Sequence, residues 1–179
     1  MIELQDFDEN DFKQLINEIP DSRFLLQWAG PKYSYPLNKE QLKDTAQQSS
    51  KKQPLLKAFK AIDTETNKTI GHVQLLEIDH EDSSCTLSRV LVFSKYRSIG
   101  LGKKMVSSVV EYAFVTLGVT NITLGVFDFN NSAIATYEKI GFIQFRVDKG
   151  ARQYQNEKWN IIRMELCLKH WQDNSGKNI

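Results

Sequence analysis

The chain has 179 residues, of which 41% are hydrophobic and 25% are charged, and its formal net charge at pH 7 is +1. This length predicts one domain with a sizeable core, and the composition is ordinary for a globular protein. A net charge so close to zero excludes a protein that binds nucleic acid through bulk positive charge. No apolar run is long enough to span a membrane, and the acidic first segment does not resemble a signal peptide, so we expect a cytoplasmic protein.

Both cysteines, Cys85 and Cys167, lie in apolar runs of strand type. Such surroundings favour buried thiols in a reducing compartment over a disulfide or a metal pair, which are the alternatives. We predict no metal site.

The N-terminal part of the chain predicts a short strand and a helix. Apolar and polar residues alternate as in a strand over residues 2–5. Asp8 or Asn10 is placed to cap a helix that runs to Ile19, because apolar side chains recur there at helical spacing. A dense apolar patch follows at residues 24–28.

A further helix and several strands come next. Asn38 is placed to cap a helix over residues 39–48, and a polar loop follows that helix. The pattern then changes to β-rich runs separated by short polar turns. These runs predict a β-meander of three strands at residues 55–62, 69–78 and 87–93.

Residues 86–110 form a stretch that reads as a strand, a glycine turn and a helix. Gly100 and Gly102 bracket the turn, and apolar residues then recur at helical spacing. Glycines allow a close backbone approach, and the first N–H groups of a helix have no partner within the helix. With the helix dipole, these groups make a site for a phosphate or pyrophosphate. The alternative is a turn with solvated lysines before an ordinary helix.

The remaining chain predicts a strand, a helix and two closing strands. The strand covers residues 121–127, and Gly125 within it marks a bulge or a close backbone approach. Asn131 or Ser132 is placed to cap a helix through Lys139. The closing strands are expected at residues 142–147 and 159–168.

This order of elements predicts a mixed α/β fold. We expect a mainly antiparallel central sheet of about six or seven strands, flanked by helices, with one strand–helix–strand crossover. One domain is expected over residues 1–170, with a polar, frayed tail at residues 171–179.

Two familiar phosphate-binding motifs do not fit the glycine turn. A P-loop needs a glycine five residues before Gly102 and a hydroxyl side chain at the position of Lys104, but Arg97 stands at the first position. The dinucleotide fingerprint needs a third glycine at the position of Met105.

A third pattern fits, because residues 97–102, Arg-Ser-Ile-Gly-Leu-Gly, resemble the Arg/Gln-x-x-Gly-x-Gly/Ala signature of the GNAT superfamily of acyl-CoA-dependent N-acyltransferases. Residues 131–142 resemble the segment of that family that starts at Asn and ends in Tyr-Glu-Lys-x-Gly-Phe. The resemblance covers residues 70–145 well and the N-terminal third poorly. The family often has Pro where Ser94 stands and Gly where Ser98 stands. Residues 24–37 also look like members that resemble ribosomal-protein N-terminal acetyltransferases.

The resemblance implies acetyl-CoA as the acyl donor. The cradle for its pyrophosphate would be the backbone N–H groups from Arg97 through Lys103, including those of Ser98, Gly100 and Gly102. Backbone groups of Val90 and Val92 would pair with the pantetheine arm, and the Val90 N–H would stabilise the oxyanion. Asn131 would bind the pantetheine arm, although a helix cap explains this residue equally well.

The resemblance also implies a general acid at Tyr137, which would donate its phenolic proton to the departing CoA thiolate. The alternative is an aromatic residue that only packs. Glu77 is the best candidate for the base that takes a proton from the amine, and a solvent-facing charge at a strand end is the alternative. The other, weaker candidates for the base are His72, Asp79, His80 and Glu81.

These features together predict an N-acetyltransferase that moves the acetyl group of acetyl-CoA directly to a small amine or a protein N-terminus. A non-catalytic acyl-CoA-binding or sensing module is the alternative, whereas a purely structural role leaves the two motifs unexplained. We expect the acceptor between the N-terminal helices and the closing hairpin, where Trp28, Tyr33 and Tyr35 would line its site. No nucleic-acid or membrane partner is expected, and a homodimer is an open alternative.

Overall fold

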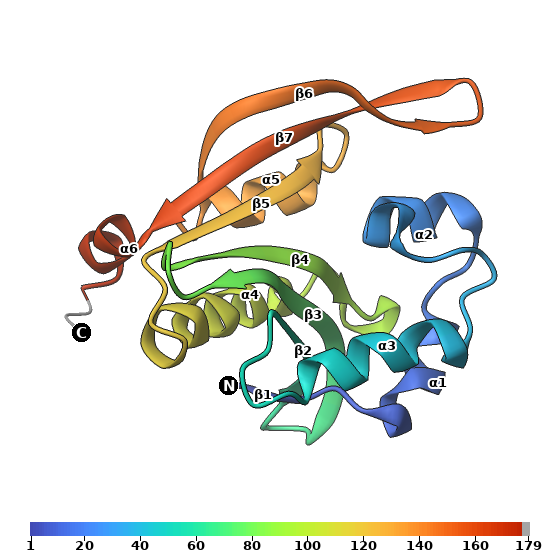
Figure 1. The fold of residues 1–179 in the computed structure, drawn as a ribbon, viewed down its shortest axis with the longest axis horizontal. Coiled ribbons are helices and arrows are strands. Elements are labelled where there is room, and N and C mark those ends of the chain that lie inside the picture. Colours follow the sequence, from blue (N-terminus) through green and yellow to red (C-terminus); the bar gives the residue numbers. More distant parts are fainter. Residues whose placement is uncertain (177–179) are drawn as a thin grey trace.

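A computed structural model describes residues 1–176, which form a sheet of seven strands with helices on both faces (Figure 1). The strands are β1 (Ile2–Asp6), β2 (Leu56–Asp63), β3 (Lys68–Asp79), β4 (Ser84–Val92), β5 (Asn121–Phe127), β6 (Ile143–Tyr154) and β7 (Glu157–Cys167). The helices are α1 (Phe12–Asn17), α2 (Ser22–Ala29), α3 (Lys39–Ser49), α4 (Leu101–Glu111), α5 (Asn131–Glu138) and α6 (Leu168–Ser175). The predicted mixed, mainly antiparallel sheet is confirmed.

The sheet has the strand order β1-β2-β3-β4-β5-β7-β6, and only β4 and β5 run parallel to each other. Their parallel pairing joins residues 84–87 to residues 121–124 and then stops. Beyond that point the two strands diverge, as Figure 1 shows. The sheet is therefore split in its middle, between the meander and the β6–β7 hairpin.

Two apolar clusters fill the two faces of the meander. On one face, α4 residues such as Val109 pack against Val73, Leu75 and Leu87. On the other face, residues of α1, α2 and α3 pack against Leu91 and neighbouring strand residues. Strict alternation would put residues 87 and 91 on the same face. They lie in different clusters because the register between β3 and β4 shifts in between, where β4 has one extra residue.

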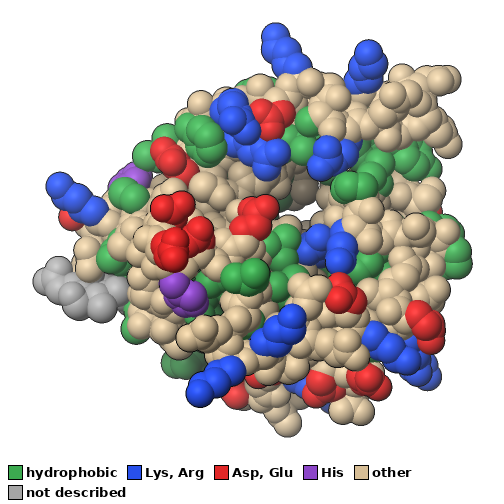
Figure 2. Space-filling view, in the orientation of Figure 1, with side chains coloured by type: hydrophobic (Ala, Val, Ile, Leu, Met, Phe, Trp, Pro, Cys, Tyr) green, Lys and Arg blue, Asp and Glu red, His purple; other side chains and the backbone are tan. Residues whose placement is uncertain are grey.

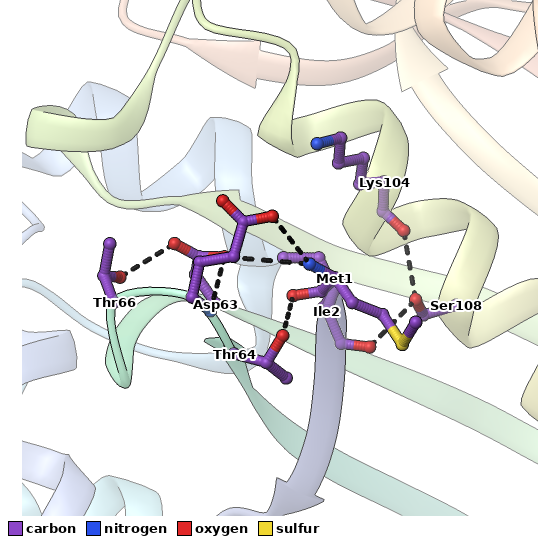
Figure 3. Close-up of polar contacts among 8 residues, drawn as sticks. Met1, Ile2, Asp63, Thr64, Thr66, Lys104 and Ser108 are labelled. Atoms are coloured by element: carbon purple, nitrogen blue, oxygen red, sulfur yellow. Dashed lines mark hydrogen bonds and ion pairs between the residues drawn. The ribbon is translucent and has the colours of Figure 1, made fainter.

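The first strand is held to the sheet and to α4 by polar contacts (Figure 3). The Met1 amino group lies 4.0 Å from a carboxylate oxygen of Asp63, and both the N–H and the hydroxyl of Thr64 donate to the Met1 carbonyl. The Ser108 hydroxyl of α4 lies 3.4 Å from the carbonyl oxygen of Ile2. These contacts hold the edge strand β1 against β2 and α4.

The helix starts were only partly predicted. The Asn38 side chain caps α3 as expected, and the Asp8 side chain caps a short 3-10 turn at Glu9–Asp11 that leads into α1. Residues 24–28, expected only as an apolar patch, lie within α2. The Asp21 carboxylate accepts from the Phe24 N–H at 2.7 Å, which is an ordinary helix N-cap.

Two expectations for the C-terminal part are wrong. The expected frayed tail is helix α6 as far as Ser175, and Trp171 in that helix is buried against Phe114 with ring centroids 5.2 Å apart. Residues 177–179 of the expected tail lie outside the described residues. Cys85 is buried as expected, whereas Cys167 is exposed, and both are free thiols.

Within residues 1–176, no helix is long and apolar enough to cross a membrane.

Candidate active site

A cavity of about 650 Å³ occupies the split in the sheet. It is lined by β4, the loop after β4, the start of α4, the second half of β5, α5 and one face of α2. Figure 2 shows the surface hollowed beneath the β6–β7 hairpin, with basic and apolar side chains among those at the rim. Four of the lining residues carry positive charge, namely Arg89, Arg97, Lys103 and Lys139. No carboxylate or histidine of the described residues belongs to the lining.

The backbone of β4 presents free groups to this cavity. The Phe93 N–H donates to the Ile70 carbonyl of β3 at 2.8 Å, so the groups of Phe93 and, two residues earlier, Leu91 point toward β3. The backbone groups of Val90 and Val92 therefore point the other way, into the gap between β4 and β5 beyond the end of their pairing. That an extended ligand pairs with these two residues like an added strand stays a prediction.

Two residues of the loop after β4 have left-handed backbone conformations. Ser98 and Gly100 have φ values of 64° and 82°, in the left-handed region. A Cβ on Gly100 would meet nothing within 4 Å, so its conformation alone favours glycine there. A Cβ on Gly102 would lie 3.3 Å from a methyl group of Val92, so glycine allows α4 to approach β4 closely. No side chain within residues 1–176 caps α4, which leaves its first N–H groups available to an anion.

Side chains anchor the loop in addition to its own backbone turn, in which the Tyr96 N–H donates to the Phe93 carbonyl at 2.8 Å. Arg97 donates from Nε to the Val92 carbonyl oxygen at 2.9 Å, so its guanidinium is turned back onto β4. The Glu18 carboxylate accepts from the Ser94 N–H at 2.7 Å and lies 3.8 Å from Nη2 of Arg97. A proline in place of Ser94 would lack this N–H. The loop therefore depends on α1 for its position.

Tyr137 lies in the cavity wall, where α5 faces β4. Its side chain is buried and packs edge-on against Phe142 with ring centroids 5.8 Å apart. Burial raises the pKa of the Tyr137 phenol well above its ordinary value of 10.0, so the group stays protonated. The hydroxyl takes part in none of the hydrogen bonds formed among residues 1–176. A protonated phenol is thus available as a donor.

The cap of α5 is not where the sequence predicted it. The Asn130 side chain, rather than that of Asn131 or Ser132, accepts from the Ala133 N–H at 3.4 Å and forms the N-cap. Asn130 lines the cavity, whereas Asn131 is exposed and does not. The sequence offers two adjacent asparagines after a strand, and the pattern alone does not tell which one begins the helix.

Glu77 lies away from the cavity lining. Its carboxylate is exposed and accepts from the Thr86 hydroxyl at 2.7 Å. Of the weaker candidates, Asp79, His80 and Glu81 are exposed, and His72 is fully buried beneath the cavity wall. The structure does not bring any of these predicted bases to the lining.

Of the three aromatic residues expected around the acceptor, only Trp28 lines the cavity. Its indole N–H donates to the Arg89 carbonyl at 2.9 Å and ties α2 to β4. The Tyr33 hydroxyl is buried against Thr45 at 2.6 Å, and Tyr35 is half exposed.

The hairpin and α2 meet on the far side of the cavity. Arg23 pairs with Glu157 at 2.7 Å and lies over the Trp159 ring, 4.9 Å from its centroid. The Ser22 and Tyr154 hydroxyls are 3.0 Å apart. These contacts bridge two parts of the chain that the split sheet does not join.

Sequence reasoning missed a polar group in the cavity wall. Arg89 lines the cavity, and its Nη1 donates to the Gln74 side-chain oxygen at 2.7 Å. Gln74 is itself fully buried and lies 2.9 Å from the His72 ring nitrogen Nε2. The signal in the sequence is the single charged side chain within the strand run of residues 87–93, because charged residues are rarely covered by other residues.

Within residues 1–176, no group of three or more His, Cys, Asp or Glu side chains is arranged to hold a metal ion.

The chain resembles known proteins in sequence and in fold. An uncharacterised N-acetyltransferase derived from the SPbeta prophage of Bacillus subtilis (strain 168), YokL, is 29% identical over 118 residues, which are 63% of this chain and 65% of that protein. The alignment thus spans slightly under two thirds of that relative. The spermidine N-acetyltransferase of Vibrio cholerae in complex with CoA and spermine has a TM-score of 0.82 at 18% identity, over 95% of this chain and 97% of the other.

A chimera of the Vibrio cholerae spermidine N-acetyltransferase and hSSAT has a TM-score of 0.81 at 17% identity, over 96% of this chain and 98% of the other. At identities this low, the structural similarity establishes a shared fold and nothing more. The sequence model of the Acetyltransferase (GNAT) family matches residues 22–142, more than half of the chain. This range contains the split of the sheet, the glycine loop and Tyr137, and the chain therefore belongs to the Acetyltransferase (GNAT) family.

Proposed function

We propose that this chain is an acetyl-CoA-dependent N-acetyltransferase that transfers the acetyl group directly to an amine in a ternary complex. The observation that carries the proposal is one cavity that holds three features together: the uncapped start of α4, the free edge of β4 and the buried phenol of Tyr137. The family supports this reaction, and the Vibrio cholerae neighbour binds CoA.

The glycine loop would hold the pyrophosphate through backbone N–H groups between Arg97 and Lys103. The Lys103 side chain lines the same cavity and adds positive charge beside the helix start. The pantetheine arm would lie along β4, where Val90 and Val92 turn their backbone groups outward. Because the Val92 carbonyl already accepts from Arg97, its N–H is the group left for the ligand.

In the chemical step, the amine nitrogen forms a bond to the thioester carbon, and the carbonyl oxygen takes up negative charge. The Val90 N–H would stabilise that oxyanion. When the intermediate collapses, the carbon–sulfur bond breaks, and Tyr137 would donate its proton to the departing thiolate. The proton released by the amine would return through cavity water to the Tyr137 phenolate, and the products are an N-acetylated amine and CoA.

The proton on the attacking amine needs another route. The described cavity lining has no carboxylate or histidine, so the amine would lose its proton to water in the cavity. Glu77 would act as the base only through intervening waters, because its carboxylate is bonded to Thr86 and lies outside the lining. Replacement of Glu77 by Gln should therefore lower kcat/KM for the amine by less than about threefold, whereas a direct base contributes about a hundredfold or more.

The acceptor is either a small amine or a protein N-terminus. The two structural neighbours act on spermidine, a small amine, which supports a small amine here. Polyamines carry several positive charges, however, and the cavity wall holds Arg89, which pairs with no carboxylate among residues 1–176. An acceptor without additional positive charge therefore suits the described lining better. Membership of a ribosomal-protein acetyltransferase branch, a cytoplasmic location and a homodimer stay predictions.

A non-catalytic acyl-CoA-binding module is the second candidate, and the lack of a base in the lining favours it. Release of free thiol from acetyl-CoA across a panel of amines and peptides separates the two. Acceptor-dependent release with formation of an acetylated product supports the enzyme. Tight CoA binding without release for any acceptor would favour the module.

A further inference from the structure

Arg89 places a positive charge in the cavity wall, and no carboxylate of the described residues pairs with it. Among residues 1–176 it belongs to no salt bridge, and its Nε atom is buried without a hydrogen-bond partner. Its guanidinium lies over the Tyr33 ring, 5.6 Å from the centroid, and its one side-chain hydrogen bond is to the neutral amide of Gln74. Burial lowers the pKa of Arg89 below its ordinary value of 12.5, which is the effect expected of a charge without a nearby anion.

Two buried neutral residues hold this guanidinium in place. Burial lowers the pKa of His72 to about 3, so its ring is neutral and its Nε2 can accept from the Gln74 amide nitrogen at 2.9 Å. That contact turns the Gln74 oxygen toward Arg89, where it accepts from Nη1. The pair orients the guanidinium without neutralising it, and an anion supplied from the cavity would complete the site.

The β-bulge in β4 decides which face Arg89 occupies. Arg89 has a φ of 48°, in the left-handed region, at the point where β4 has an extra residue relative to β3. Strict alternation would put residue 89 on the α4 face with Leu87. Its side chain instead contacts Gln74 and Tyr33 on the face covered by α2 and α3. Arg89 is thereby separated from the glycine loop at the start of α4, where the cofactor phosphates are expected.

We propose that the acceptor carries a carboxylate near its reacting amine, and that Arg89 binds this carboxylate. The proposal rests on the proposed acetyltransferase function. One carboxylate matches one guanidinium in charge, and the planar geometry of the two groups suits paired hydrogen bonds. Such a carboxylate is found in a free amino acid and in a peptide that begins with an acidic residue. An amine without a carboxylate would leave the guanidinium uncompensated.

Matched acceptor pairs test this proposal. The first pair is glycine and glycinamide, and the second is two short peptides that begin with Asp or Asn. The wild type should acetylate the acid of at least one pair with a kcat/KM about tenfold or more above that of its neutral partner, since a hydrogen bond to a charged group contributes this much. The pair that shows the preference identifies the source of the carboxylate. In Arg89→Met the preference should disappear through a higher KM for the acid, with the KM for acetyl-CoA unchanged.

Three further variants make the result specific. Gln74→Glu supplies an internal carboxylate to Arg89 and should abolish the preference although the arginine is retained. Arg89→Lys should keep part of the preference. Arg146→Met removes an exposed arginine on β6 outside the cavity lining and should leave both acceptors unaffected. Thermal unfolding of each variant checks that the chain is folded.

Several results would overturn the proposal. These are equal rates for acid and neutral acceptors in the wild type, a preference that survives in Arg89→Met, or a higher KM for acetyl-CoA in that variant. If no acceptor is acetylated, the proposed function fails, and calorimetry with CoA present decides this inference instead. N-acetylglycine should then bind at least about tenfold more tightly than N-acetylglycinamide in the wild type only, and equal binding would contradict the carboxylate site.

Discussion

The Nε atom of Arg97 donates a hydrogen bond to the carbonyl oxygen of Val92 at 2.9 Å. This contact joins the glycine loop to the open edge of β4, and it directs the arginine side chain toward the strand rather than toward a ligand. The family signature accepts Arg or Gln at this position. Both side chains have an N–H that can donate to a carbonyl, which explains why the signature accepts either residue.

We therefore expect Arg97→Gln to keep the KM for acetyl-CoA within about threefold of the wild type, and Arg97→Ala to raise it about tenfold through loss of a charge-assisted hydrogen bond. Steady-state kinetics with varied acetyl-CoA measure the difference. If Arg97→Gln were as impaired as Arg97→Ala, the arginine would act through its charge on the phosphates instead.

Gly102 gives a second test of the loop. A Cβ there lies 3.3 Å from Val92, and a glutamate would add both bulk and negative charge at the helix start. Gly102→Glu should abolish CoA binding measured by calorimetry. Lys104→Gln changes the net charge by the same amount at an exposed position on the same helix, and it should weaken binding by less than about tenfold. Normal CoA binding by Gly102→Glu would mean that the phosphate site lies elsewhere.

His72 predicts a pH dependence of stability. Its pKa is about 3 in the folded chain, below its ordinary value of 6.5, because burial disfavours the charged ring. The unfolded chain therefore binds a proton first as the pH falls, and the native state loses stability between pH 6.5 and about 3. The loss approaches about 1.4 kcal/mol per pH unit.

Urea unfolding of the wild type and of His72→Phe between pH 7 and pH 4 isolates this contribution, because other titrating groups are common to both. The free energy of unfolding of the wild type should fall more steeply with decreasing pH than that of the variant. Parallel curves would show that His72 titrates normally in the native state.

The two cysteines should differ in reactivity. Cys85 is buried, and burial raises the pKa of its thiol to about 12, whereas Cys167 is exposed at the end of β7. A maleimide at neutral pH should label Cys167 within minutes and leave Cys85 unlabelled until the chain unfolds. Peptide mass spectrometry identifies the labelled site, and rapid labelling of Cys85 in the native chain would contradict the described core.

The sequence was sufficient for the sheet and for the glycine loop, because their signals are local. The residues of β3 and β4 form largely apolar runs in the sequence, and the glycine at position 100 permits the positive φ that the turn has there. The expected role of Glu77 was not supported by its position, since a period of two along β3 does not show that its carboxylate bonds Thr86 outside the cavity. Trp171 is buried although its neighbours are polar, because α6 packs it onto Phe114.

Arg89 could not be placed from the sequence at all. Its position depends on a one-residue register shift between β3 and β4, and strand pairing of this kind is decided by contacts between distant segments. The N-cap of α5 could not be placed from the sequence either. Asn130 and Asn131 are both suitable cap residues, and the conformation of the preceding turn decides that Asn130 accepts from the Ala133 N–H.

The proposed acid role of Tyr137 can be tested by Tyr137→Phe. Removal of one hydroxyl leaves the packing against Phe142 in place and deletes the proposed proton donor, and Tyr112→Phe is a matched control at a half-buried tyrosine outside the cavity lining. The measurement is single-turnover transfer of labelled acetyl from acetyl-CoA to an amine that the wild type acetylates. The rate should fall by about a hundredfold or more in Tyr137→Phe, whose CoA affinity should be unchanged. The rate in Tyr112→Phe should equal that of the wild type. Transfer at the wild-type rate in Tyr137→Phe would show that Tyr137 is not the proton donor.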